Sequence, residues 1–428
     1  MTSARLSRAA IIAVGSELLT PLRIDTNSLY LTEQLNALGI AVAFKSVAGD
    51  DRAELAALIR LARERVDLVV MTGGLGPTDD DVTREVAAEV LGRPLIEDAA
   101  ITERMRARFA ARFQGPMPEI NRRQAMVPAA ARVVENTRGS APGLWMEDGD
   151  RVVLLLPGPP RELKPMVEQL SAGLLRERAS GLLLRRRIVR IAGRIESQAE
   201  ELLRPLYQLW GSRQPPIAAT ILAALGQLEL HLSTTAADAA AADGALEAAV
   251  ADVVRVFGVD VFSTDGRALE AVVGDLLAAG GLTIAVAESC TGGLITSRLT
   301  DVAGSSRYVD RGIVTYSNEA KTELLGVPAE LIAAHGAVSE PVALAMAAGV
   351  RERSRVAVGV GVTGIAGPGG GSDDKPVGTV AVAAVTEQVT RSRVFRFLGE
   401  REQVKFQAAQ AALDMVRRIM VDGSHASR

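Results

Sequence analysis

The sequence contains little cysteine, histidine and lysine, and each shortage restricts the chemistry available to the chain. Its one cysteine, Cys290, excludes an internal disulfide bond and a metal cage built from cysteines. Three histidines leave few bases for a histidine-dependent hydrolase. Only five of the 48 basic residues are lysines, and the rest are arginines. Because lysine can lose its proton in a protein and arginine cannot, a lysine in such a chain points to a site that needs an amine.

Long apolar runs and an excess of charge of one sign are also missing. No run is long enough to cross a bilayer, and the apolar segment near the start meets Glu17 too early for a secretory signal. The formal net charge is −3, and no stripe of basic and aromatic residues suggests a nucleic-acid surface. The sequence therefore predicts a soluble cytoplasmic protein that binds neither membranes nor nucleic acid.

What the chain does have is an alternation of apolar strands and amphipathic helices. Its 428 residues, 48% of them hydrophobic, suffice for two to four domains with their own cores. Strands and helices alternate from residue 9, and again from residue 266, which is typical of doubly wound parallel sheets. Between these regions, GQLELHLSTTA and two helical patterns indicate a small α+β module. The predicted fold class is α/β, with domains over 1–175, 176–264 and 265–428.

The strongest local signal is VVMTGGLGPTDDDVTREVAAEVLG. A strand ends in Gly73, Gly74 and Gly76, whose bare backbone can approach a ligand, and a helix with free N–H groups follows. The aspartates Asp79–Asp81 come directly after this loop. A helix cap needs only one of them. Carboxylates beside a phosphate need a divalent cation between them, so the pattern predicts a metal-dependent phosphate site.

A candidate nucleophile lies in VAESCTGGLITSRL, where another predicted strand ends and a helix follows. Ser289 ends the strand, so its hydroxyl can be presented at the edge of the sheet. The N–H groups of Thr291 and Gly292 could then face a developing oxyanion. The neighbouring Cys290 has no histidine near it in sequence and is expected to be a small buried apolar residue.

A base for this serine comes from VTYSNEAK. Lys321 lies at a helix start and Tyr316 ends the preceding strand. Burial can lower the pKa of a lysine enough for it to accept a proton, so a Ser–Tyr–Lys relay for amide hydrolysis is chemically coherent. The simpler alternative is a solvated Lys321 paired with Glu319 or Glu323.

A third segment, TGIAGPGGGSDDKPVGT, combines a strand end with a loop of six glycines. Such loops allow close backbone approach, and anions are their usual ligands. Lys375 within it and Arg401 after it could add charge for a phosphate. The alternative is a flexible hairpin without a ligand.

The motifs GSELL, DTNSLYL, TGGLGPTDDDVT, NRRQA and PGPPREL resemble the CinA (competence/damage-inducible protein A) family, whose first domain is similar to the MoaB/MogA molybdopterin-binding fold. The resemblance extends over essentially the whole chain. It implies a metal-dependent ADP-ribose pyrophosphatase, using Mg, Mn or Co, that forms AMP and ribose 5-phosphate. The implied phosphate-binding residues are Gly73, Gly74, Gly76 and Glu17. The implied metal ligands are Asp80, Asp81 and Asp50.

The motifs AESCTGG, AGSSRYVDRGIVTYSNEAK, HGAVSEP, TGIAGPGGG and KPVGTV are similar to the PncC-type nicotinamide mononucleotide (NMN) deamidase domain of the same family. The resemblance implies hydrolysis of NMN to nicotinic acid mononucleotide and ammonia, without a cofactor. The implied catalytic residues are Ser289, Tyr316 and Lys321. The implied substrate-binding residues are Thr291, Gly292, Ser306, Thr363, Gly364, Lys375 and Arg401.

Together these features predict a bifunctional hydrolase of pyridine-nucleotide salvage, because NMN and ADP-ribose are both breakdown products of NAD. One alternative is a molybdopterin-binding or adenylating first domain. Another is a regulatory binding protein, linked to competence and DNA damage, in which one or both sites are inactive. The middle module is similar to a KH unit but lacks a clear GxxG loop, so spacing or dimerisation is the expected role, within a homodimer. Whether a serine or an activated water attacks the amide stays open.

Overall fold

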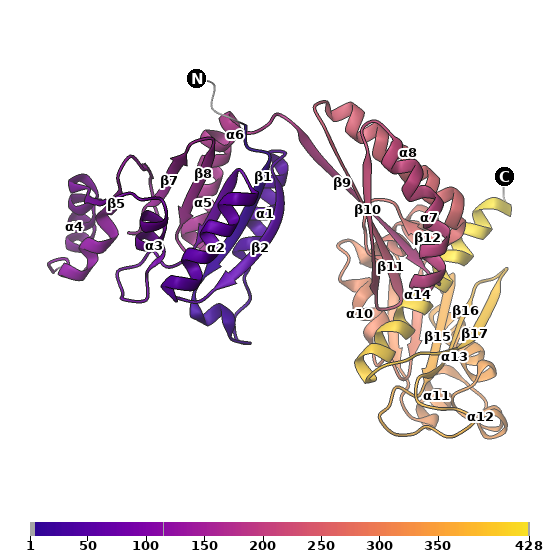
Figure 1. Ribbon diagram of the computed structural model, residues 1–428. Coiled ribbons are helices and arrows are strands. Elements are labelled where there is room, and N and C mark those ends of the chain that lie inside the picture. Colours follow the sequence, from indigo (N-terminus) through magenta and orange to yellow (C-terminus); the bar gives the residue numbers. More distant parts are fainter. Residues whose placement is uncertain (1–4, 114, 427–428) are drawn as a thin grey trace. The chain divides into compact units, whose positions relative to one another are not determined.

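The computed structural model describes residues 5–113 and 115–426 (Figure 1). By its internal contacts the chain divides into two compact units. One unit runs to Arg185 and includes Thr234–Asp243, and the other contains Arg186–Ser233 and the chain from Gly244 onward. None of the described helices has both the length and the apolar character to span a bilayer.

The first unit is built around a six-stranded sheet. Its strand order is β2 (Ala41–Ala48), β1 (Arg8–Val14), β3 (Leu68–Thr72), β8 (Arg151–Leu156), β7 (Gly143–Asp148) and β6 (Arg132–Val134). The strands β2, β1, β3 and β8 are parallel, while β7 and β6 continue the sheet antiparallel. The central strands β1 and β3 are almost entirely buried, as expected of a sheet covered on both faces.

Helices cover both faces of this sheet. On one face the core includes residues of α1 (Asn27–Ala37), α5 (Pro160–Ala172) and α6 (Leu174–Arg178). On the other it includes residues of α2 (Arg52–Arg65), α3 (Thr83–Val90) and α4 (Ala99–Phe113). This part also contains a two-stranded sheet, formed by β4 (Leu95–Glu97) and β5 (Met126–Pro128). Two 3-10 helices complete it, η1 (Ser16–Leu19) and η2 (Glu119–Ala125).

The middle of the chain forms a four-stranded sheet. Its order is β10 (Ile217–Ala224), β11 (Gln227–Ala236), β9 (Leu183–Ala192) and β12 (Val261–Ser263). Two helices, α7 (Glu196–Ser212) and α8 (Ala239–Phe257), share one apolar core with it, and η3 (Gly258–Asp260) leads into β12. Alternate residues of β11 are buried, which agrees with the one wet face that the sequence pattern predicts.

The last part of the chain contains a five-stranded sheet. Its order is β14 (Val309–Val314), β13 (Ile284–Glu288), β15 (Val358–Gly364), β16 (Thr379–Val385) and β17 (Thr390–Arg396). The first three strands are parallel and the last two are antiparallel. On one face of the sheet, the core includes residues of α9 (Leu269–Ala279), α10 (Leu294–Thr300) and α14 (Arg401–Ala426). On the other face, it includes residues of α11 (Asn318–Leu325), α12 (Ala329–His335) and α13 (Glu340–Ser354). The 3-10 helix η4 (Ser305–Arg307) precedes β14.

The predicted fold class is confirmed: two α/β sheets with helices on both faces flank a small α+β module. The sequence pattern did not indicate the antiparallel edges β6–β7 and β17, or strand β10. β17, TRSRVFR, carries three arginines and is partly exposed, so it lacks the apolar pattern of a buried strand.

Candidate active sites

The carboxyl ends of the first sheet's strands open into a cavity of ≈ 730 Å³. Ligands of open α/β sheets bind at this edge. All the residues proposed for the phosphate and metal site line this one cavity, although they come from three separate segments: Glu17, Asp50, Gly73, Gly74, Gly76, Asp80 and Asp81. The segments after β1, β2 and β3 supply them.

Two of the glycines are required by the backbone. Gly73 has φ +100°, and a Cβ there would lie 2.1 Å from the carbonyl oxygen of Val14. Gly74 has φ +63°, and its Cβ would lie 2.2 Å from Thr83 Oγ1. Any side chain would therefore push the loop away from the sheet edge. Glycine keeps the floor of the cavity close to β1 and α3.

The three aspartates have three different environments. Asp81 accepts hydrogen bonds from the N–H groups of Gly76 (2.8 Å) and Thr78 (2.9 Å), so it fixes the loop from inside. Asp79 is fully exposed and pairs with Arg123 at 3.0 Å, outside the cavity lining. Asp80 lines the cavity, and hydrogen bonding from Thr78, with the charge of Arg123, lowers its pKa. Asp80 and Asp81 thus both line the cavity, and only Asp81 is engaged by the N–H groups of its own loop.

The remaining proposed ligands are only partly available. Asp50 Oδ2 accepts hydrogen bonds from the Ser16 N–H (3.1 Å) and Ser16 Oγ (2.6 Å), which leaves Oδ1 for a ligand. Glu17 is exposed beside it. Within residues 5–113 and 115–426, no group of three or more His, Cys, Asp or Glu side chains is close enough to hold a metal ion. Magnesium commonly needs just one or two carboxylates together with substrate phosphates, so the donor set fits a metal that enters with the substrate.

Asn27 and Glu162 are among the polar residues of this cavity that were not predicted from the sequence. Asn27 donates to the Gly158 carbonyl (2.7 Å) and to Thr72 Oγ1 (3.2 Å), while its own carbonyl oxygen is buried without a partner. Glu162 is 9% exposed and accepts a hydrogen bond from Asn136 at 2.8 Å. Both lie in motifs that carry the family resemblance, DTNSLYL and PGPPREL, and that was the available signal.

A second, smaller cavity of ≈ 190 Å³ lies at the carboxyl ends of β13 and β15. The residues that line it are Ser289, Cys290, Tyr316, Asn318, Lys321, Ala337, Val338, Thr363, Gly364, Ala366 and Arg401. Six of the residues predicted for the deamidase site are among them, including all three proposed for catalysis.

Lys321 is the central residue of this cavity. It is 1% exposed, and its Nζ lies 3.3 Å from Ser289 Oγ and 3.0 Å from the carbonyl oxygen of Thr315. No carboxylate of the described residues lies within ion-pair distance, so the alternative of a solvated lysine paired with Glu319 or Glu323 is wrong. Burial lowers the pKa of Lys321, since it removes the charged amine from water.

Arg401, the first residue of α14, joins the two sides of the cavity mouth. Its guanidinium donates to the Tyr316 hydroxyl (3.0 Å) and to the carbonyl oxygen of Gly367 in the glycine-rich loop (2.7 Å). Tyr316 is 62% exposed, so its hydroxyl lies at the rim, where it remains able to donate a hydrogen bond. Thr363 lies deeper and donates to the carbonyl of Ala337 at 2.9 Å.

The turn that carries Ser289 is held by Glu288, a residue that the sequence argument passed over. Glu288 is fully buried. Its carboxylate accepts hydrogen bonds from the N–H groups of Gly293 (2.9 Å), Ile295 (3.1 Å) and Thr296 (2.9 Å), and from Thr296 Oγ1 (2.7 Å). These are the free N–H groups of the first turn of α10, so Glu288 fixes the start of the helix against the end of β13.

Four proposed substrate-binding residues lie elsewhere. Thr291 is fully buried and does not line the cavity. The Gly292 N–H donates to the Ser289 carbonyl at 3.1 Å, so it is not free for an oxyanion. Ser306 is exposed in η4, away from the lining. Lys375 donates to the carbonyl of His335 at 2.8 Å, because its loop folds back onto the end of α12.

Cys290 behaves as the sequence suggested. It is 4% exposed and belongs to the apolar core on the α14 face of the sheet. Burial raises the pKa of its thiol to about 12, so the thiolate that a nucleophile requires is not populated near neutral pH.

Comparison with known proteins gives two family matches. Residues 10–177 match the family described as "Probable molybdopterin binding domain", and residues 266–420 match "CinA C-terminal domain". A CinA-like protein from Acidobacterium capsulatum is 47% identical over 414 residues, covering 96% of this chain and 99% of that protein. Another from Koribacter versatilis is 46% identical over 417 residues, covering 96% and 100%. A crystal structure of the competence/damage inducible protein CihA from Agrobacterium tumefaciens covers 35% of this chain and 92% of its own, with 44% identity and a TM-score of 0.35.

Proposed function

The chain belongs to the CinA family, and on that premise we propose that its last domain hydrolyses the carboxamide of NMN, giving nicotinic acid mononucleotide and ammonia. The observation that carries the proposal is the buried contact between Lys321 Nζ and Ser289 Oγ, in a cavity without histidine. Burial lowers the pKa of Lys321 and so favours the neutral amine that a serine nucleophile needs as its base.

The geometry supports a two-step reaction. Lys321 Nζ takes the proton of Ser289 Oγ as the oxygen bonds to the carboxamide carbon. The lysine then returns that proton to the leaving nitrogen, the C–N bond breaks and ammonia departs, leaving an ester on Ser289. A water molecule, deprotonated by the same lysine, then attacks the ester carbon, the bond to Ser289 Oγ breaks, and the lysine returns the proton to Oγ as the acid is released. The Tyr316 hydroxyl, held by Arg401, is placed to donate to the substrate at the rim.

The cavity size suits one end of the substrate. At ≈ 190 Å³ it is smaller than the about 300–1,000 Å³ of typical whole-ligand sites. The nicotinamide ring would therefore enter, while the ribose phosphate would lie outside, beside Arg401 and the glycine-rich loop. The guanidinium of Arg401 and the loop N–H groups are the donors nearest to that position.

The pH dependence of this reaction follows from the lysine. Only the neutral amine accepts a proton, so kcat/KM for ammonia release should fall about tenfold per pH unit below the pKa of Lys321 and level off above it. Because burial lowers that pKa, the acidic limb should lie well below the value of about 10.4 of an exposed lysine. Ammonia release from NMN, measured across pH, tests this. A rate that does not fall on the acidic side would contradict a neutral lysine base.

We also propose that the first domain is a metal-dependent ADP-ribose pyrophosphatase forming AMP and ribose 5-phosphate. Its support is that every residue implied for the phosphate and metal site lines one cavity of ≈ 730 Å³, which is large enough for a dinucleotide-sized ligand. Asp80, with Asp50 or Glu17, would hold the metal together with the pyrophosphate. When bound, such a cation neutralises phosphate charge and activates water. The glycine loop would approach the phosphates by its backbone.

Metal removal distinguishes the two proposed activities in one sample. With EDTA, AMP release from ADP-ribose should drop by about 100-fold or more, and excess Mg²⁺, Mn²⁺ or Co²⁺ should restore it. Ammonia release from NMN should not change, which makes the second activity an internal control. If no AMP forms with any of the three metals, the pyrophosphatase proposal is wrong. Molybdopterin binding, which the first family match suggests, would then be the better candidate.

A further inference from the structure

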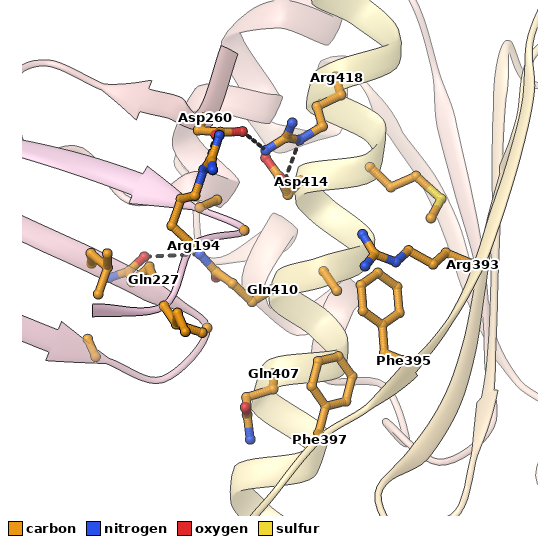
Figure 2. Close-up of a pocket in the computed structure, with 18 of the residues that line it drawn as sticks. Arg194, Gln227, Asp260, Arg393, Phe395, Phe397, Gln407, Gln410, Asp414 and Arg418 are labelled. Carbon is orange, nitrogen blue, oxygen red and sulfur yellow. Dashed lines mark hydrogen bonds and ion pairs between the residues drawn. The ribbon is translucent and has the colours of Figure 1, made fainter. Parts of the chain in front are cut away.

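A further cavity shares no lining residue with either proposed active site. It measures ≈ 1090 Å³ and lies where the middle module meets the last domain, within one compact unit. Figure 2 shows its walls: the turn after β9 and the β10–β11 hairpin on one side, and α14 and β17 on the other.

Strand β17 supplies an aromatic wall. The rings of Phe395 and Phe397 lie 5.3 Å apart between centroids and are nearly parallel, at 9°. The guanidinium of Arg393 lies over the Phe395 ring, 4.9 Å from its centroid. These residues alternate along the strand, so they share one face of the sheet. Figure 2 shows the three side chains beside α14. Flat rings with a neighbouring guanidinium are a stacking surface for an aromatic ligand.

Of the charged residues that line the cavity, Arg393 and Glu196 form no ion pair within the described part of the chain. Asp260 forms ion pairs with Arg194 (2.6 Å) and Arg418 (2.8 Å). Asp414 forms an ion pair with Arg418 (2.7 Å). These carboxylates are therefore already neutralised by arginines. Arg393 has no acidic partner within 4 Å among residues 5–113 and 115–426, and it is exposed. An anion next to Arg393 would meet a free guanidinium.

Side-chain amides add hydrogen-bonding positions. Gln410 on α14 donates to Gln227 on the hairpin at 3.0 Å, so the two walls are joined by an amide pair. Gln407, one turn earlier, donates its amide N–H to the carbonyls of Leu398 (2.9 Å) and Gln403 (3.2 Å). This leaves the Gln407 side-chain oxygen free to accept from an amine or a ribose hydroxyl.

We propose that this cavity binds a nucleoside phosphate, with the base against the Phe395–Phe397 wall and the phosphate at Arg393. Few ligand classes need a stacking surface, amide hydrogen bonds and a free guanidinium together, and nucleotides need all three. The volume also exceeds the about 300–1,000 Å³ range of small-molecule sites, so a whole nucleotide fits. The proposal does not depend on either proposed activity.

Photolabelling of the full chain with 8-azido-AMP tests the proposed nucleotide site. Mass spectrometry of the peptides then identifies the segments that carry the label. The label should appear on segments 390–397 or 407–418, and excess AMP should suppress it. Arg393→Glu should lower this labelling at least tenfold, because it replaces the free cation with an anion.

Arg396→Glu is the matched control. It makes the same charge change on the same exposed strand, at a position that does not line the cavity, and labelling should stay within twofold of the parent. Label confined to the first domain, or equal labelling of the Arg393→Glu and Arg396→Glu variants, would overturn the proposal. Hydrogen exchange of β15 and β16, which belong to the same sheet as β17, serves as the folding check for both variants.

Discussion

Replacing Ser289 with alanine, or Lys321 with methionine, is expected to lower ammonia release from NMN by about 10³-fold or more. The serine variant removes the oxygen that attacks the carboxamide. The lysine variant keeps an unbranched apolar chain in a buried position but removes the amine that contacts that oxygen. Because the two groups act as one unit, the double variant should be hardly slower than either single variant.

Two substitutions of the same kind serve as controls. Ser297→Ala lies on the exposed side of α10, and Lys45→Met lies on an exposed position of β2 in the first domain. Neither touches the cavity, so both should keep the parent rate within about twofold. A Ser289→Ala variant with nearly the parent rate, beside an inactive Lys321→Met variant, would contradict the serine nucleophile and indicate water activated by the lysine.

Replacing Glu288 with alanine is expected to destabilise the last domain by about 3 kcal/mol or more and to remove the proposed amidase activity. The change leaves three backbone N–H groups and one hydroxyl without the carboxylate that accepts from them in the protein interior. Glu288→Gln, which keeps one acceptor oxygen, should fall between the parent and the alanine variant.

A chain of several domains does not unfold in one step, so the loss of stability must be measured in the last domain alone. Hydrogen exchange of β13 and β15, recorded as the denaturant concentration rises, gives this measurement. Glu330→Ala is the control, because Glu330 is an exposed residue in the first turn of the short helix α12. If Glu288→Ala unfolded at the same denaturant concentration as Glu330→Ala, then Glu288 would not hold the turn as described.

The sequence predicted the parts of each site that depend on strand ends. Ser289 and the loop at Gly73–Gly76 directly follow apolar strands, and parallel strands place their carboxyl ends at one sheet edge. Ser289 and the loop at Gly73–Gly76 each line a cavity at such an edge, whereas most of the other site residues were implied by the family resemblance. Because lysine is scarce in the chain, Lys321 was also predicted as a site residue. The local pattern NEAK does not indicate that this lysine is buried.

The features that sequence reasoning missed depend on side-chain direction and on long-range packing. Lys375 lies within the glycine-rich loop as predicted, but the loop folds onto the end of α12, where the amine donates to the carbonyl of His335. Glu288 looks like an ordinary charged residue at a strand end, and only the approach of α10 explains its burial. The cavity beside Arg393 joins segments almost 200 residues apart in the sequence, which no local pattern could bring together.

The most direct test of the central claim is the product analysis of NMN incubated with the purified full chain. The account predicts equal amounts of ammonia and nicotinic acid mononucleotide, formed equally well in EDTA, and no release of free nicotinamide. Release of nicotinamide without ammonia, or no consumption of NMN by a folded chain at any pH, would contradict the assignment of Ser289 and Lys321 to amide hydrolysis.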